Sequence, residues 1–166
     1  MRFILLDKVI SLEAGKSITA EKALSLAEEY LSDHFPSFPV LPGVLMIEAM
    51  VQTAALLVQV SQDFSHSMVV LSEARNVKYK SFVKPGNVLR IEVRVRELSA
   101  SESSFSGSAW VGQQEMVSAR FRLRHFNLAD DDADMAAVDE QIIQVLRQRA
   151  KLLGATCPVE EGKSGE

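Results

Sequence analysis

The segment HFPSFPVLPGVLMIEAMVQ, His34–Gln52, decides the fold of this chain. Its first half contains three prolines, which fix φ and lack a backbone N–H, so we expect a loop of extended and turn geometry. From Gly43 to about Val60 the sequence has helix length and is apolar almost all round. A helix of this composition has to be wrapped by other structure.

The sequence on both sides of this segment supplies strands for the wrapping. Residues 3–12 and 17–24 are predicted strands on either side of the turn EAGK, and SLAEEYLSD predicts a short helix. Four further strands are predicted in MVVLSEARNVKYKSFV, VLRIEVRVREL, SSFSGSAWVG and EMVSARFRLRHF. In VLRIEVRVREL, apolar and charged residues alternate with the period of a strand that is buried on one face. Residues 1–126 therefore predict an α+β domain, an antiparallel sheet curled around one helix.

The C-terminal part predicts a different element. Residues 127–155 begin with aspartates and end with Arg147, Arg149 and Lys151 before Gly154, the charge order that a helix dipole favours. We expect an amphipathic helical extension that packs on the domain or on a neighbouring chain. Its predicted apolar stripe consists of Met135, Val138, Ile142, Val145, Leu146, Ala150 and Leu153. Residues 156–166 are expected to be disordered.

Composition limits the possible functions. The chain has 166 residues, 47% of them hydrophobic, and a net charge of −4, which suits one globular domain and argues against a general nucleic-acid binder. The single Cys157 cannot form an internal disulfide, which indicates a reducing compartment, and we expect a cytoplasmic protein.

No targeting or membrane segment is predicted. The N-terminal apolar stretch meets Asp7 and Lys8 before it reaches signal-peptide length. The apolar run Val44–Val60 is short for a membrane span and contains several polar residues, so a buried helix is the better interpretation.

Two polar residues on the apolar helix raise the question of chemistry. Glu48 and Gln52 are four residues apart and therefore share one helix face. An ionised carboxylate buried against hydrocarbon is costly, so Glu48 has to pair, shift its pKa or line a cavity. The alternative interpretation of Glu48 is a structural carboxylate that is hydrogen-bonded to backbone and takes no part in a reaction. The helix start at Gly43 offers unpaired N–H groups, and His34 lies just upstream. Together these groups suit proton transfer next to a carbonyl.

The same segment closely resembles the active-site segment of the (3R)-hydroxyacyl-[acyl-carrier-protein] dehydratases of bacterial type II fatty acid synthesis. That pattern reads His-Phe-Pro-Gly-His-Pro-Val-Met-Pro-Gly-Val-Leu, then Glu-Ala-Met-Ala-Gln, and the spacing of fourteen from His34 to Glu48 is kept. A second block, NVKYKSFVKPGNVLRIEV, resembles the family's later strand, turn and strand. The resemblance covers about residues 1–126 and implies a hotdog fold, in which a curved sheet wraps a central helix.

The resemblance also implies an assembly and a reaction. The family forms homodimers with each active site built across the interface, so His34 of one subunit would face Glu48 of the other. The resemblance also allows larger assemblies of these dimers, such as a trimer of dimers. The implied substrate is a 3-hydroxyacyl chain on acyl carrier protein, the implied product is the trans-2-enoyl thioester, and no cofactor or metal is implied.

Carried over by position, the resemblance gives each site residue a role. His34 matches the base that removes the C2 proton, and Glu48 matches the acid that protonates the departing hydroxyl. The Gly43 N–H matches the group that polarises the thioester carbonyl. Gln52 matches a residue that fixes the carboxylate or a water. Phe35 and Val44 complete the predicted substrate-binding set.

The sequence departs from the family pattern at several positions. Ser37 and Phe38 replace Gly-His, Leu41 replaces the usual Met, and Glu73 and Arg75 replace a Gly and an Asp. These changes leave chain-length preference open, and they are compatible with a specialised substrate.

A small basic cluster follows in the second block. Lys78, Lys80 and Lys84 are interpreted either as a docking patch for the acidic carrier protein or as a solvated strand face.

Two alternative functions stay open. A hotdog thioesterase places a carboxylate on the same helix but does not need His34. A non-catalytic acyl-binding paralogue would keep the fold and lose turnover.

Overall fold

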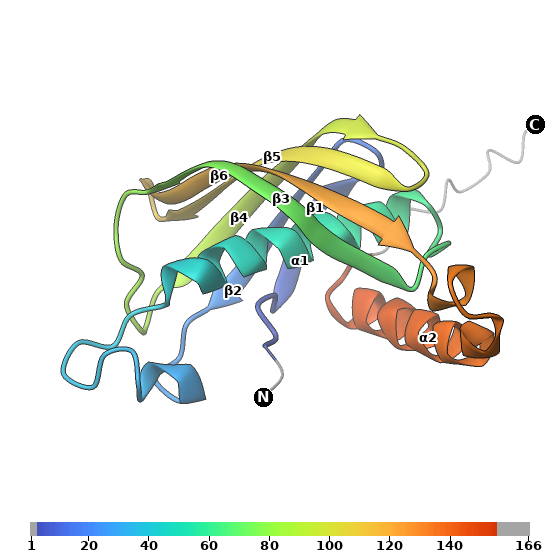
Figure 1. The fold of residues 1–166 in the computed structure, drawn as a ribbon. Helices are drawn as coiled ribbons and strands as arrows, with labels where there is room; N and C mark the ends of the chain where they lie inside the picture. The colour runs from blue at the N-terminus through green and yellow to red at the C-terminus, as the bar shows by residue number, and fades with distance from the viewer. Residues whose placement is uncertain (1–2, 156–166) are drawn as a thin grey trace, which may run out of the picture.

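A curved sheet of six antiparallel strands wraps one long helix, as Figure 1 shows. The structure is a computed structural model and describes residues 3–155; the tail predicted to be disordered, with Cys157, lies outside this range. The strand order across the sheet is β1-β2-β4-β5-β6-β3. The strands are β1 Lys8–Glu13, β2 Ser17–Ala23, β3 Met68–Tyr79, β4 Val88–Leu98, β5 Glu102–Val111 and β6 Gln114–Phe126. The predicted α+β hotdog architecture is confirmed.

The wrapped helix α1, Gly43–Ser61, is the centre of the core. By length and composition alone α1 is apolar enough to cross a membrane, with a mean hydropathy of 1.7, but 72% of that window is buried inside the domain. Gly107 of β5 lies directly against α1. A Cβ at Gly107 would lie 2.8 Å from the Met50 Sδ and 3.1 Å from the Phe121 Cε1. The missing side chain at this position lets the strand pass directly over the helix.

The alternation predicted for residues 88–98 matches β4. Leu89, Ile91 and Val93 are fully buried against α1, while Arg94 and Arg96 on the other face are exposed.

The predictions for the N-terminal region need correction. Residues 3–7 are not part of β1, which begins at Lys8. The Leu5 N–H donates instead to the Gln52 side chain of α1, at 3.1 Å, and only Asp7 bonds to the sheet, through its N–H to the Glu21 carbonyl of β2 at 2.9 Å. The short helix predicted in residues 25–33 is a single 3₁₀ turn, η1, Glu29–Leu31.

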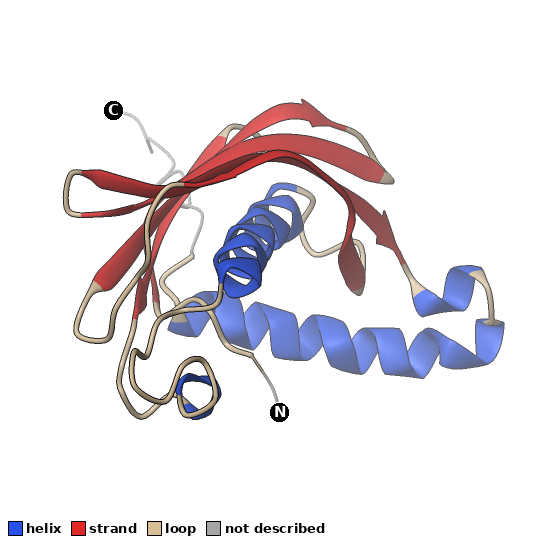
Figure 2. Cartoon of the chain, turned by 60° about the vertical axis from the view of Figure 1, so that its left-hand side comes forward, coloured by secondary structure: helices blue, strands red, loops and turns tan. Residues whose placement is uncertain are grey.

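The C-terminal extension forms the helix α2, Ala136–Leu152, after the 3₁₀ turns η2 Leu128–Asp130 and η3 Ala133–Met135. Figure 2 shows that α2 lies across the open side of the curved sheet, beneath α1. Its C-terminal end is fixed to the first strand, because the Val9 N–H donates to the Leu153 carbonyl at 2.8 Å. Residues 127–155 as a separate unit stay a prediction.

The buried face of α2 differs from the predicted stripe. Val138 and Val145 are 36% and 48% exposed, whereas Asp139 is buried. The Asp139 carboxylate accepts hydrogen bonds from the Ser67 hydroxyl and from the Leu128 and Ala129 N–H groups. These three donors rotate the helix so that a carboxylate, and not a valine, faces inward. Burial by itself raises the pKa of Asp139, but the three donors outweigh it and hold that pKa below its usual value.

Candidate active site

Glu48 is a half-buried carboxylate on a helix that is otherwise core. Its Oε1 accepts a hydrogen bond from the Gln52 Nε2 one turn further along α1, at 3.0 Å. The predicted i, i+4 pair is therefore present as a bonded pair.

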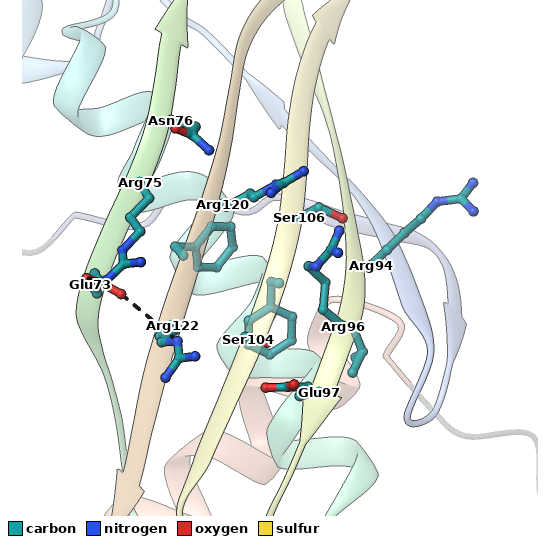
Figure 3. Close-up of a pocket in the computed structure, with 13 residues that line it drawn as sticks. Glu73, Arg75, Asn76, Arg94, Arg96, Glu97, Ser104, Ser106, Arg120 and Arg122 are labelled. Atoms are coloured by element: carbon teal, nitrogen blue, oxygen red, sulfur yellow. Dashed lines mark ion pairs between the residues drawn. The ribbon is translucent and has the colours of Figure 1, made fainter.

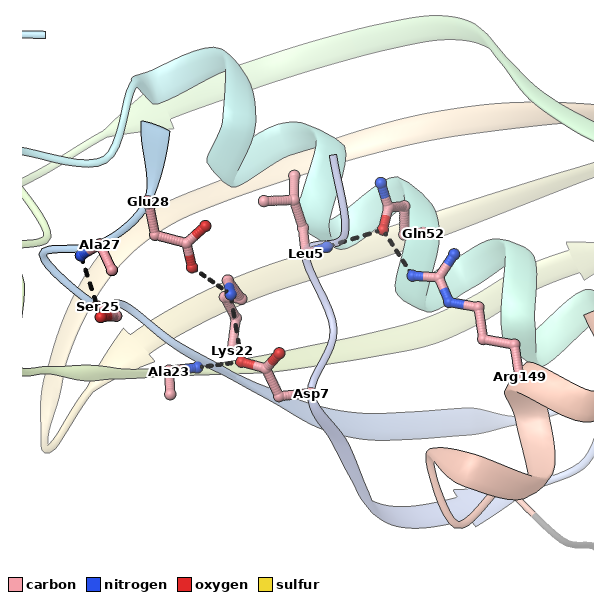
Figure 4. A network of polar contacts seen from close by, with 9 residues as sticks. All are labelled: Leu5, Asp7, Lys22, Ala23, Ser25, Ala27, Glu28, Gln52 and Arg149. Atoms are coloured by element: carbon pink, nitrogen blue, oxygen red, sulfur yellow. Dashed lines mark hydrogen bonds and ion pairs between the residues drawn. The ribbon is translucent and has the colours of Figure 1, made fainter. Parts of the chain in front are cut away.

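Gln52 is the centre of a small polar network, part of which Figure 4 shows. Its Oε1 accepts from the Leu5 N–H at 3.1 Å and from the Arg149 Nη2 at 3.3 Å. Its Nε2 donates to the Phe3 carbonyl at 3.1 Å as well as to Glu48. Both amide hydrogens and both lone pairs of Gln52 are thus used. The network connects the N-terminal segment, α1 and α2 at the position next to Glu48.

The N-terminus of α1 is open to a ligand. The N-cap residue Pro42 makes no side-chain capping bond, and its carbonyl accepts from the Leu45 N–H, at 2.9 Å. The N–H groups of Gly43 and Val44 precede that first bonded turn and are available to an anion or a polarised carbonyl. Val44 is 70% exposed.

The space left by the missing Gly43 side chain is already used by the protein. A Cβ at Gly43 would lie 2.9 Å from the Cε1 of Tyr79, at the end of β3. The Tyr79 ring is half exposed and lies beside the helix start.

His34 lies in the proline-rich loop before α1 and is half buried. Its carbonyl accepts from the Val40 N–H at 3.1 Å, and its ring lies 4.2 Å, centroid to centroid, from the exposed ring of Phe35. Within residues 3–155 of one chain, no hydrogen bond or ion pair joins His34 to Glu48. His34 and Phe35 therefore belong to the loop before α1, whereas Glu48 and Gln52 belong to α1 itself.

The three lysines of the predicted docking patch have different surroundings. Lys80 is paired with Glu115 of β6. Lys84 lies 5.0 Å from the centre of the Phe38 ring in the His34 loop. Lys78 lines a hollow on the outer face of the sheet. The lysines do not converge on one point, and their docking role stays a prediction.

A hollow of about 640 Å³ contains none of the predicted site residues. It lies on the outer face of the sheet and is shown in Figure 3. Arg75, Arg120, Ser106 and Arg94 form one row across four strands there. Shallow, strongly charged and remote from α1, this hollow does not resemble an acyl site.

A second cavity lies next to Gln52. It has a volume of about 200 Å³ and is enclosed by α1, the start of β3 and α2. Its lining is mainly apolar and includes Leu56, Met68, Leu146 and Leu153, with Gln52 and Arg149 at its polar side. Among residues 3–155, no group of three or more His, Cys, Asp or Glu side chains is placed to hold a metal ion.

Comparison with known proteins identifies the family. The model of the FabA-like domain matches residues 1–120. The 3-hydroxyacyl-[acyl-carrier-protein] dehydratase FabZ of Variovorax paradoxus is 40% identical over 115 residues, which cover 68% of this chain and 77% of that protein. The chain belongs to this dehydratase family. The FabZ of Pelotomaculum thermopropionicum is similar as well, with 38% identity over 112 residues, 68% of this chain and 80% of that one. The predicted resemblance is confirmed, and the family is one of hydro-lyases.

Solved structures agree on the fold of this dehydratase-family chain. The dehydratase heterocomplex ApeI:P from Xenorhabdus doucetiae superposes with a TM-score of 0.68 at 20% identity, over 80% of this chain and 90% of that chain. The protein smu.793 from Streptococcus mutans, solved with acetyl CoA, gives a TM-score of 0.56 at 16% identity, over 75% and 92% of the two chains. At these identities the likeness shows the hotdog fold alone.

Two residues at the site were not among the sequence-based candidates. Tyr79 lies within the family-like block NVKYKSFV, between two lysines, and this local sequence indicates a charged strand rather than a ring beside the helix start. Arg149 is 97 residues from Gln52 in the chain and lies beyond the family match, so no local pattern points to it.

Proposed function

We propose that this chain eliminates water from a (3R)-3-hydroxyacyl thioester carried on acyl carrier protein, in fatty acid synthesis, to give the trans-2-enoyl thioester. The observation that carries the proposal is Glu48, a half-exposed carboxylate on the core helix of a dehydratase-family chain, held by Gln52 at 3.0 Å. A carboxylate that served packing alone would be an expensive choice on this helix.

The proposed mechanism uses three groups of the chain. His34 takes the C2 proton, and the electron pair of that C–H bond forms the C2=C3 double bond. The C3–O bond breaks, and the hydroxyl leaves as water with the proton of Glu48. The Gly43 N–H at the start of α1 polarises the thioester carbonyl and so stabilises the enolate character at C2. A proton then passes from His34 to Glu48 through solvent, which resets the site.

We propose a homodimer in which His34 of one subunit meets Glu48 of the other. Two observations support it: no bond joins the two groups within one chain, and β3 is a twelve-residue edge strand with one side unpaired. A long open edge is a site for pairing with a second strand. Heterodimer formation with another dehydratase-like chain is the competing assembly, since the structural neighbour ApeI:P is a heterocomplex.

The carrier protein is proposed to dock beside the His34 loop. Phe38 of this loop and Phe82 form an exposed aromatic pair, with ring centroids 6.1 Å apart. Lys84 lies next to the Phe38 ring. A cation next to exposed aromatic rings suits an acidic protein that delivers an apolar chain.

Turnover tests the proposal. We expect the purified protein to hydrate trans-2-enoyl and dehydrate 3-hydroxyacyl thioesters of acyl carrier protein. His34→Ala and Glu48→Gln should each lower kcat by about 10²–10⁴-fold at unchanged Tm. Free thiol released in the same reactions measures hydrolysis and tests the thioesterase alternative, which does not need His34. A well-folded dimer with no turnover on short or long chains would contradict the proposal.

A further inference from the structure

We propose that Arg149, on the helix α2 beyond the family match, is a positioning residue for Glu48 and acts through Gln52. This inference rests on the proposed function, because it assigns a role to a group near the proposed acid. It starts from the hydrogen bond that the Arg149 Nη2 donates to the Gln52 Oε1, at 3.3 Å.

The first step concerns the direction of the Gln52 amide. Two donors, the Arg149 guanidinium and the Leu5 N–H, face its oxygen, and two acceptors, Glu48 and the Phe3 carbonyl, face its nitrogen. A flipped amide would place its oxygen against the Glu48 carboxylate and its N–H groups against two other donors. Arg149 and Leu5 hold the oxygen together, at 3.3 and 3.1 Å, and Arg149 is the donor that carries a full positive charge.

The second step concerns the Glu48 carboxyl group. With the amide in this direction, the Gln52 N–H occupies Oε1 of Glu48. A protonated carboxyl carries one hydrogen, and the oxygen that already accepts an N–H bond is the poorer place for it. The proton is therefore directed to Oε2, the oxygen left for a departing hydroxyl. A correctly oriented proton donor is part of what positioned acid catalysis requires.

The third step separates the role of Arg149 from that of the residues that dock α2. Apart from Asp139, the inward side of α2 and its C-cap is occupied by residues that pack, such as Leu146, Ala150 and Leu153. A guanidinium next to an apolar cavity is costly unless it is hydrogen-bonded. α2 is also attached independently, through Asp139 and through the Arg147 guanidinium, which donates to the Asp63 Oδ1 at 3.0 Å.

Arg147 supplies a matched control, since it is the same residue type on the same helix and does not touch Gln52. Arg149→Met keeps an unbranched, flexible side chain and removes the guanidinium donors. We expect it to lower kcat by about tenfold, the equivalent of one hydrogen bond, with KM unchanged. Arg149→Lys, which retains a charged donor, should recover most of kcat. Arg147→Met should lower Tm and leave kcat as it is.

A double-variant cycle tests the route of the effect. If Arg149 acts through Gln52, then Arg149→Met should have no further effect on kcat in a Gln52→Met protein. If the two losses multiply, or if Arg147→Met lowers kcat as much as Arg149→Met, α2 acts only as a scaffold and the inference is wrong.

A measurement without turnover separates this inference from the proposed function. In ¹⁵N-labelled protein the side-chain amide signals of Gln52 are identified by their loss in Gln52→Met. We expect these signals to shift and to exchange faster with solvent in Arg149→Met, and to be unchanged in Arg147→Met. Unchanged signals in Arg149→Met overturn the inference. Should the wild-type chain show no turnover, the proposed function fails, and the Gln52 signals alone decide whether Arg149 holds the amide.

Discussion

Gly107→Ala tests the claim that the sheet wraps α1 at van der Waals distance. The added Cβ would lie 2.8 Å from the Met50 Sδ and 3.1 Å from the Phe121 Cε1, both inside normal contact distance. Met50 is fully buried and Phe121 is 2% exposed, so neither has open space to move into.

The magnitude follows from two opposing terms. Overpacking by one methyl group typically costs about 1–3 kcal/mol. Alanine in place of glycine returns about 0.4–1 kcal/mol, because it reduces the entropy of the unfolded chain. Taking the middle of each range, we expect the free energy of unfolding to fall by about 1–2 kcal/mol. For a chain of this length that corresponds to a fall in Tm of about 2–8 °C.

The assay is thermal and urea unfolding at one fixed protein concentration, with Ser106→Ala on the outer face of the same strand as the control. The control should change stability by less than about 0.5 kcal/mol. In a Met50→Ala background the new methyl group has room, so Gly107→Ala should cost much less there. An equal loss in both backgrounds, or no loss in either, would refute the packing argument.

Three further predictions concern the site and the pH dependence of stability. Gly43→Ala places a Cβ 2.9 Å from the half-exposed Tyr79 ring, which has solvent to move into. We expect a Tm within about 3 °C of wild type and a fall in kcat of about tenfold. Unchanged kcat would argue against carbonyl binding at this helix start. Asp139→Asn should lower Tm at neutral pH. Because the folded pKa of Asp139 lies below its ordinary value of 3.8, the wild-type advantage should be full above pH 3.8 and disappear as the pH falls through the folded pKa, as calorimetry of both proteins at several pH values would show. Burial lowers the pKa of His125 below 6.5, and the Ala100 carbonyl offsets this only in part, so stability should fall as the pH drops below 6.5. In His125→Phe, Tm should depend less on pH in this acidic range. An unchanged dependence of Tm on pH would contradict the assignment to His125.

Local patterns in the sequence predicted most of the fold. The alternation of residues 88–98 reports a strand with one buried face, and the apolar segment after Pro42 reports a helix surrounded on most sides. Where prediction failed, distant partners decided the outcome. Residues 3–7 have strand-like composition, yet the Leu5 N–H bonds to a side chain 47 residues away. On α2, three donors from outside the helix turn Asp139 inward and Val138 outward.

The candidate site divides in the same way. The spacing of Glu48 and Gln52 on one helix is a local feature and was predictable as a bonded pair. The Arg149 contact joins residues 97 positions apart, and the pairing of Lys80 with Glu115 joins residues 35 positions apart. The sequence near the site contains no pattern that predicts either contact. The local sequence therefore suggests one basic cluster. In the structure, Lys80 pairs with Glu115 and Lys84 lies next to the Phe38 ring.

Subunit complementation tests the central claim, that His34 and Glu48 act together across a dimer interface. His34→Ala and Glu48→Gln proteins are each prepared inactive, mixed in equal amounts, and allowed to exchange subunits. Random exchange makes half of the dimers mixed, and each mixed dimer has one intact site of two, so we predict about a quarter of the wild-type activity. A mixture that exchanges subunits and stays inactive would contradict a site shared between the two chains.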